Sequence, residues 1–169
     1  MRLPETFNSN EWFIIAVCII LIILSFLLKR SFLFSQIIVI FTVNFFLAAS
    51  LDHILSGPPY DLYDIMDMPE FEIFDFVMYL LVYPLSGYLF ICFFSIFIEK
   101  GFPVIVFLFM STLTTVGLEW ISVQFHVYKH LNWTYFYSFI SYLGIFCINI
   151  ALYFWFANEN NSIHKSANS

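Results

Sequence analysis

Glu119 is the residue with the clearest chemical potential, because it lies inside a long apolar segment, in the run VGLEWISVQF. A carboxylate in a membrane span costs about 2.5–3.5 kcal/mol on insertion scales, so such a residue is a functional hypothesis by default. The polar residues around it are spaced 4, 4, 3 and 4, which places them on one helix face: Ser111, Thr115, Glu119, Ser122 and His126. Lipid would exclude this face, so we expect it to point toward other helices or water.

Three other apolar segments carry matching polar rows. In chain order, these rows are Asn44, Ala48 and Asp52, then Asp75, Tyr79, Tyr83 and Ser86, and then Ser138, Tyr142 and Asn149. We expect the rows to converge in the outer half of a helical bundle. Convergence would produce either an outward-opening polar pocket or interhelical hydrogen bonds that hold the bundle together, worth about 0.6 kcal/mol per contact. The sequence alone favours the second interpretation.

The composition indicates that these rows lie in a membrane. Of 169 residues, 62% are hydrophobic and 11% are charged, and the mean hydropathy is +0.89. Soluble domains are nearer 45–50% apolar and about 25% charged. These values exclude an ordinary soluble domain, an intrinsically disordered chain and a disulfide scaffold. The net charge of −6, without a basic run, argues against a nucleic-acid partner.

Five segments approach the roughly 20 apolar residues that a spanning helix needs. They cover about 12–28, 32–51, 76–98, 102–125 and 135–157. Because unpaired strand edges cannot lie in lipid, we predict an all-α integral membrane bundle of five transmembrane helices, forming one domain over 1–157. Pro84 and Gly87 predict a kink in the third helix. We expect the polar tail, 158–169, to be disordered.

The distribution of charge predicts the orientation. Four basic residues fall on one side of a five-helix topology and two on the other: Lys29, Arg30, Lys100 and Lys165 against Arg2 and Lys129. The loop 52–75 carries seven acidic residues and no basic one. Basic loops stay in the cytoplasm, so we predict a multi-pass protein of the cytoplasmic (plasma) membrane with its amino terminus outside and its carboxyl terminus inside.

The acidic outer loop 52–75 is the largest extramembrane element. Gly57-Pro58-Pro59 excludes a continuous helix there. Its acids alternate with Tyr, Leu, Ile, Met and Phe, which is typical of a short amphipathic segment. We expect this segment to lie on the bilayer surface or across the helix mouths.

No sequence motif identifies an enzyme. The chain contains no G-x-S-x-G elbow, P-loop or dinucleotide fingerprint. His126 and His130 are four apart and could share an ion on a helix, but no established metal-ligand spacing occurs, so we predict neither a metal nor a cofactor. Proton transfer by Glu119 with His126 in a lipid-modifying enzyme stays open, although the sequence leans against catalysis.

Residues 119–142 read EWISVQFHVYKHLNWTYFYSFISY, and residues 83–88 read YPLSGY. Over about 76–157 this pattern resembles a family of small, multi-pass, functionally uncharacterised membrane proteins of Bacillus- and Clostridium-type bacteria. The resemblance implies a helical bundle in a bacterial cytoplasmic membrane and supplies no activity. The special positions that it implies are Glu119, Tyr128, Trp133, Ser138 and Tyr142.

From the residues and the resemblance together we predict one polar cluster. Its members are Glu119, Ser138, Tyr142, Tyr128, Trp133, His126, Asp75 and Tyr79. Because a short link makes the last two helices antiparallel neighbours, we expect Ser138 and Tyr142 to donate hydrogen bonds to Glu119.

The favoured function is that of a structural or interaction subunit, whose partners are the lipid bilayer and other membrane proteins or a second copy. The alternative is a binding protein or small transporter for a polar or amphiphilic ligand, through an outward-facing pocket around Glu119. The chain has no visible inverted repeat, which weighs against a self-contained transporter.

Overall fold

The structure, a computed structural model, describes residues 7–28, 32–66 and 72–167. Its elements are α1 (Ser9–Leu27), α2 (Phe34–Leu55), β1 (Tyr63–Ile65), α3 (Ile73–Val77), the π-helical segment η1 (Met78–Val82), α4 (Tyr83–Glu99), α5 (Val104–Gln124), β2 (Tyr128–His130) and α6 (Tyr135–Ala167). α3, η1 and α4 form one continuous span, so the described residues contain five helices long and apolar enough to cross a membrane. This confirms the predicted all-α bundle.

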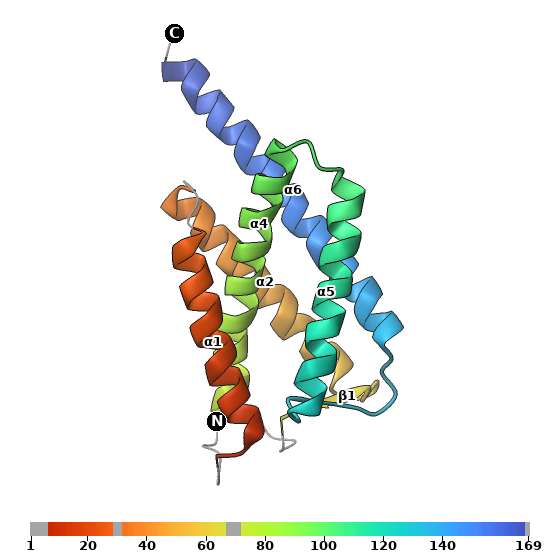
Figure 1. Cartoon of the computed structure of the whole chain (residues 1–169). Helices are drawn as coiled ribbons and strands as arrows, with labels where there is room; N and C mark the ends of the chain where they lie inside the picture. The colour runs from red at the N-terminus through yellow and green to blue at the C-terminus, as the bar shows by residue number, and fades with distance from the viewer. Residues whose placement is uncertain (1–6, 29–31, 67–71, 168–169) are drawn as a thin grey trace.

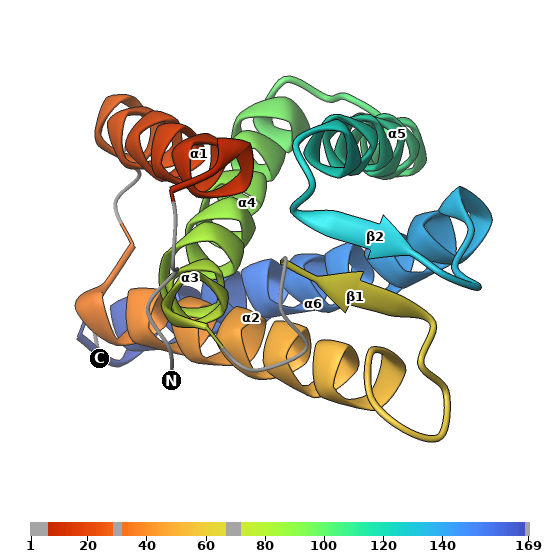
Figure 2. The same ribbon diagram turned by 90° about the horizontal axis from the view of Figure 1, so that it is seen from below.

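The span that ends in α4 is the centre of the bundle. It packs against α1, α2, α5 and α6, and Figure 2 shows the other four spans arranged around it. Aromatic stacking forms much of this core: the rings of Phe90 and Phe146 lie 4.1 Å apart and nearly parallel, and Phe94 meets Tyr153 edge-on at 5.1 Å. Because lipid removes most of the hydrophobic drive between helices, such close packing supplies the stability.

Proline at position 84 explains the interruption in the central span. Its ring removes one backbone N–H and clashes with the carbonyl four residues earlier. The five residues before Tyr83 adopt a π-helical turn, which is the local adjustment expected beside such a break. The π-helical turn thus lies just before Pro84, next to the position where Pro84 and Gly87 predict a kink.

A buried amide pair joins α2 to α6 beside Gly87. Asn44 Nδ2 donates to Asn149 Oδ1 at 2.9 Å, and Asn149 Nδ2 donates back to Asn44 Oδ1 at 3.0 Å. A Cβ at Gly87 would overlap the amide group of the Asn44 side chain. Only glycine therefore lets α4 approach α2 closely enough to enclose the pair.

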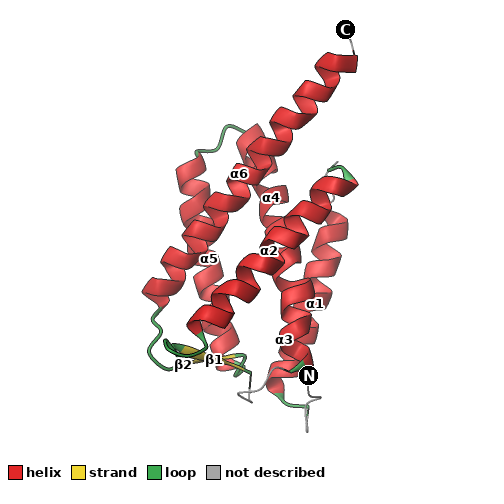
Figure 3. Cartoon of the chain, turned by 180° about the vertical axis from the view of Figure 1, so that it is seen from behind, coloured by secondary structure: helices red, strands yellow, loops and turns green. Residues whose placement is uncertain are grey.

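One end of the bundle, here named the strand end, carries a two-stranded antiparallel sheet (Figure 1; Figure 3). β1 pairs with β2 in the register Tyr63↔His130, Asp64↔Lys129 and Ile65↔Tyr128. The amino terminus of α1, the carboxyl termini of α2 and α5 and the start of α6 lie at the same end. Of the predicted loop 52–75, the first residues belong to α2 and residues 63–65 form the strand β1 at this end of the bundle, which was not expected. Residues 67–71 of the loop lie outside the described residues.

The helix boundaries differ from the predicted spans mainly at the carboxyl end. α6 continues to Ala167 and so includes residues 158–167, which the sequence led us to expect in a disordered tail. This segment contains neither glycine nor proline, and extending an existing helix avoids the cost of nucleation. Residues 168–169 lie outside the described residues.

Candidate functional site

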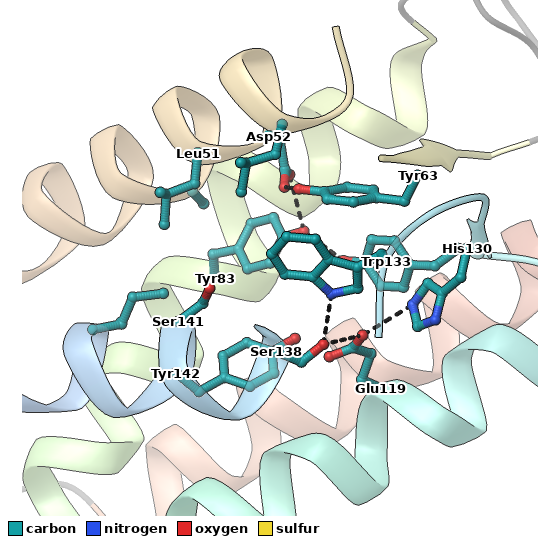
Figure 4. A pocket seen from close by; sticks show the side chains of 14 residues that line it. Leu51, Asp52, Tyr63, Tyr83, Glu119, His130, Trp133, Ser138, Ser141 and Tyr142 are labelled. Carbon is teal, nitrogen blue, oxygen red and sulfur yellow. Dashed lines mark hydrogen bonds and ion pairs between the residues drawn. The ribbon is translucent and has the colours of Figure 1, made fainter. Parts of the chain in front are cut away.

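A cavity of about 90 Å³ lies inside the strand end, between α2, α4, α5 and α6 and beneath the two strands (Figure 4). It is lined by Ala48, Leu51, Asp52, Leu55, Tyr63, Tyr83, Glu119, Tyr128, His130, Trp133, Ser138, Ser141, Tyr142 and Ile145. This volume holds a few water molecules or one small polar group. The lining combines two carboxylates with five aromatic side chains, so we name it the carboxylate cavity.

Glu119 is the centre of one hydrogen-bond network in the cavity. Its Oε1 accepts a hydrogen bond from Ser138 Oγ at 2.7 Å and lies 3.0 Å from His130 Nε2, which forms an ion pair when the imidazole is protonated. Trp133 Nε1 donates to Ser138 Oγ at 2.7 Å. The indole, the hydroxyl and the carboxylate thus form a chain of hydrogen bonds, in which each bond polarises and strengthens the next. The predicted contact between Ser138 and Glu119 is present.

The second oxygen of Glu119 has no hydrogen-bond partner among the described residues, although the side chain is only 7% exposed. The Tyr142 side chain on α6 lines the same cavity and lies near the Glu119 carboxylate, and the predicted hydrogen bond between the two stays a prediction. Buried polar atoms are nearly always paired with protein, water or an ion. Glu119 Oε2 is therefore a buried acceptor whose hydrogen-bonding capacity is not used among the described residues.

Asp52 is the centre of a second network on the opposite wall. Its Oδ1 accepts from the Tyr63 hydroxyl at 2.5 Å, and its Oδ2 accepts from the Tyr83 hydroxyl at 3.3 Å. The Tyr83 hydroxyl also shares a short hydrogen bond with that of Tyr128. Two tyrosines thus bond directly to a carboxylate that is 8% exposed, and Tyr128 is linked to it through Tyr83.

The pairing of β1 with β2 explains why residues from outside the spanning helices line the cavity. Side chains alternate along a strand, so Tyr128 and His130 share the face of β2 that covers the cavity. Lys129 points away and pairs at 3.6 Å with Asp64, its partner across the sheet. Burial and the nearby Asp52 carboxylate both raise the pKa of the Tyr63 and Tyr128 hydroxyls, which therefore remain protonated donors.

The structure brings together five of the eight predicted cluster residues. Glu119, Ser138, Tyr142, Tyr128 and Trp133 all line the carboxylate cavity. The other three predicted residues, His126, Asp75 and Tyr79, lie elsewhere, and each has its own explanation.

His126 is exposed and follows α5 in a tight turn, with φ = 60°. Four-residue spacing predicts a shared face only while the helix continues, and α5 ends at Gln124. Asp75 and Tyr79 line a second cavity of about 620 Å³ on the other side of β1. Asp75 accepts from the backbone N–H of Glu72 at 2.8 Å and so caps α3, whereas Tyr79 also reaches Asp52.

The polar stripe of α5 contributes only Glu119 to the cavity. The hydroxyls of Thr115 and Ser122 donate to the carbonyls of Ser111 and Leu118, four residues earlier on the same helix. Such internal bonds satisfy hydroxyl groups without a partner helix. The predicted stripe is therefore present along the helix, but most of it makes no interhelical contact with the site.

The predicted cluster left out five lining residues that carry polar groups: Asp52, Tyr63, Tyr83, His130 and Ser141. Asp52 and Tyr83 belonged to predicted polar rows, so their spacing carried a usable signal. Tyr63 and His130 depend on the pairing of two three-residue strands, which gives no periodic pattern. The described residues contain no group of three or more His, Cys, Asp or Glu side chains that could hold a metal ion.

Comparisons with family models, with curated proteins and with solved structures gave no match. The class of the protein therefore follows from its own fold and site. It is an all-α, multi-pass membrane protein, built on five spanning helices among the described residues. Its polar side chains enclose a buried carboxylate cavity at one end of the bundle.

Proposed function

We propose that this chain is a membrane-embedded binding protein, which takes a polar or amphiphilic ligand into the carboxylate cavity. One observation carries the proposal: Glu119 and Asp52, from helices far apart in sequence, line the same buried space, and Glu119 Oε2 lacks a partner among the described residues. Two carboxylates at one buried site are costly without a compensating group. The donors that they meet, the hydroxyls of Tyr63, Tyr83 and Ser138, are neutral, and His130 is charged only when protonated. A ligand with positive charge adds the remaining compensation.

A structural or interaction subunit is the second candidate function. The reciprocal pair between Asn44 and Asn149 favours it, because both amides are satisfied and neither faces the carboxylate cavity. The polar rows thus differ in their roles along the bundle. Near the middle of the bundle the polar rows hold helices together, and at the strand end they leave hydrogen-bond acceptors for a ligand.

The cavity is further proposed to open toward the outside of the cytoplasmic membrane. The acid-only loop 52–75 and the distribution of basic residues support this orientation. In a background with Cys18, Cys92 and Cys147 replaced by alanine, we expect Asp64→Cys to react with an impermeant thiol reagent added to intact cells. Lys100→Cys should react only after the membrane is permeabilised. The reverse labelling pattern contradicts both the orientation and the outward opening.

Ligand binding itself is tested by native mass spectrometry of protein purified in mild detergent from its own host. We expect the wild-type protein to retain a non-covalent adduct. Ser141→Phe places a ring in the cavity and should remove the adduct, whereas Ile140→Phe, whose side chain is exposed on the same helix, should retain it. If the wild type carries no adduct, or if the adduct survives equally in Ser141→Phe, the proposed function is wrong.

A further inference from the structure

The carboxylate cavity has the electrostatic character of a cation site. Among the described residues that line it, none is a lysine or arginine. The one imidazole in this lining, of His130, is already held by Glu119, and the Trp133 N–H is already bonded to Ser138. A ligand group therefore meets two carboxylates and no free cation among these described lining residues.

The aromatic walls favour the same kind of ligand. Tyr63 and Trp133 have ring centroids 5.4 Å apart at 65°, and Tyr63 and Tyr128 are 6.4 Å apart at 81°. Together with Tyr83 and Tyr142, these steeply inclined rings line the cavity (Figure 4). Ring faces attract ammonium groups, and such aromatic cages recognise them in other proteins.

An apolar groove of about 560 Å³ lies next to the cavity, on the side toward the other end of the bundle. Ala48, Tyr83 and Ile145 line both spaces, so the two are neighbours with these three side chains between them. Six phenylalanines line the groove: Phe90, Phe93, Phe97, Phe102, Phe107 and Phe146. Along α5 the lining extends from Phe107 to Leu118, which is roughly 16 Å at the rise of an α-helix.

The groove is open on the surface that faces the bilayer, because Met110 and Leu118 on its lining are each more than half exposed. Its length suits an alkyl chain rather than a head group. The small volume of the carboxylate cavity and its two acidic groups disfavour a phosphate-bearing head group.

Resting on the proposed function, we infer that the ligand is a single-chain amphiphile with an ammonium head group. The head group binds between Asp52 and Glu119, and the chain lies in the phenylalanine groove. Such a ligand has to pass beside Ala48, which has the smallest of the three side chains shared by the two linings. This geometry requires both parts of the ligand for strong binding.

The test measures equilibrium binding of labelled dodecylamine to the full-length protein in a nonionic detergent. Unlabelled dodecylamine, dodecanol, dodecyl sulfate and methylamine compete in separate arms. We expect dodecylamine to compete fully. The other three should compete weakly, because dodecanol lacks the charge, dodecyl sulfate has the opposite charge and methylamine lacks the chain. Glu119→Gln should weaken dodecylamine binding about tenfold or more, whereas Glu99→Gln, an exposed carboxylate at the other end of the bundle, should not.

The outcomes separate the two proposals. Equal competition by dodecanol or dodecyl sulfate refutes the ammonium head group, and equal competition by methylamine refutes the groove, while a binding function survives in each case. If dodecylamine shows no saturable binding, the ammonium inference is wrong, and the adduct experiment above then decides the proposed function separately. Should Glu119→Gln aggregate, the four-way competition on the wild-type protein decides alone.

Discussion

Cells whose only copy carries Glu119→Gln are expected to lose the protein's function while the protein itself stays folded. Glutamine keeps the shape of glutamate, and its amide oxygen still accepts the hydrogen bonds from Ser138 and His130. The free energy of unfolding should therefore change by no more than about 1–2 kcal/mol. What the variant loses is the negative charge at the unpartnered oxygen, which is the feature that a ligand would meet.

Glu119→Leu separates charge from hydrogen bonding further. Leucine leaves the donors on Ser138 and His130 unpaired, but it also removes the cost of a carboxylate within a span, so we expect little net destabilisation. The measurement combines the melting temperature in detergent with complementation of a deletion strain, and Glu99→Gln serves as the control. If Gln and Leu at position 119 both complement fully, Glu119 has no functional role and the site assignment fails.

Gly87→Ala is expected to give the largest loss of stability in the bundle. The added Cβ would overlap Cγ and Nδ2 of Asn44, closer than any ordinary contact. Asn44 cannot turn away freely, because it is bonded to Asn149 in both directions and to the carbonyl of Ile40. Overpacking costs about 1–3 kcal/mol, and breaking the amide pair adds about 0.6 kcal/mol or more.

Two other glycines provide matched controls for this prediction. Gly117 and Gly144 lie in α5 and α6, and a Cβ added at either would have no described atom within 4 Å, so Gly117→Ala and Gly144→Ala should be neutral or slightly stabilising. Asn44→Ala should relieve the clash, so the Gly87→Ala, Asn44→Ala double variant is expected to be more stable than additivity predicts. Equal melting temperatures for all three glycine-to-alanine variants would falsify the close-approach explanation.

The spans were predictable because hydropathy and the needs of the peptide backbone in lipid leave few alternatives. The contact between Glu119 and Ser138 was predictable for a related reason: the link between their helices is short, and regular spacing fixes which side chains share a face. The contacts of Asp52 could not be predicted from helix spacing, since its hydrogen-bond partner Tyr63 lies in β1, within the predicted loop 52–75. Two strands of three residues each have too little pattern for sequence to reveal their pairing, and that pairing decides which loop residues cover the cavity.

The sequence of a single helix also does not show whether a hydroxyl group bonds within its own helix or to a neighbouring helix. Thr115 and Ser122 have the spacing of interhelical residues, yet their hydroxyls bond to their own helix. Spacing indicates the direction of a side chain but does not distinguish between a partner on the next helix and a carbonyl one turn away. Asp75 shows the same ambiguity, because its carboxylate accepts a hydrogen bond from the backbone N–H of Glu72 and not from a side chain on another helix.

The position of the carboxylate cavity has a thermodynamic consequence. Its walls come from both halves of the chain, with Asp52 and Tyr63 before α4 and Glu119 and Ser138 after it, so no fragment contains a complete site. A ligand that binds only the assembled cavity shifts the folding equilibrium toward the closed bundle by RT ln(1 + [L]/Kd), which is about 2.7 kcal/mol at a hundredfold excess over Kd. Occupancy would then hold α5 and α6 against α2, and the lifetime of the folded protein in the membrane would depend on the supply of its ligand.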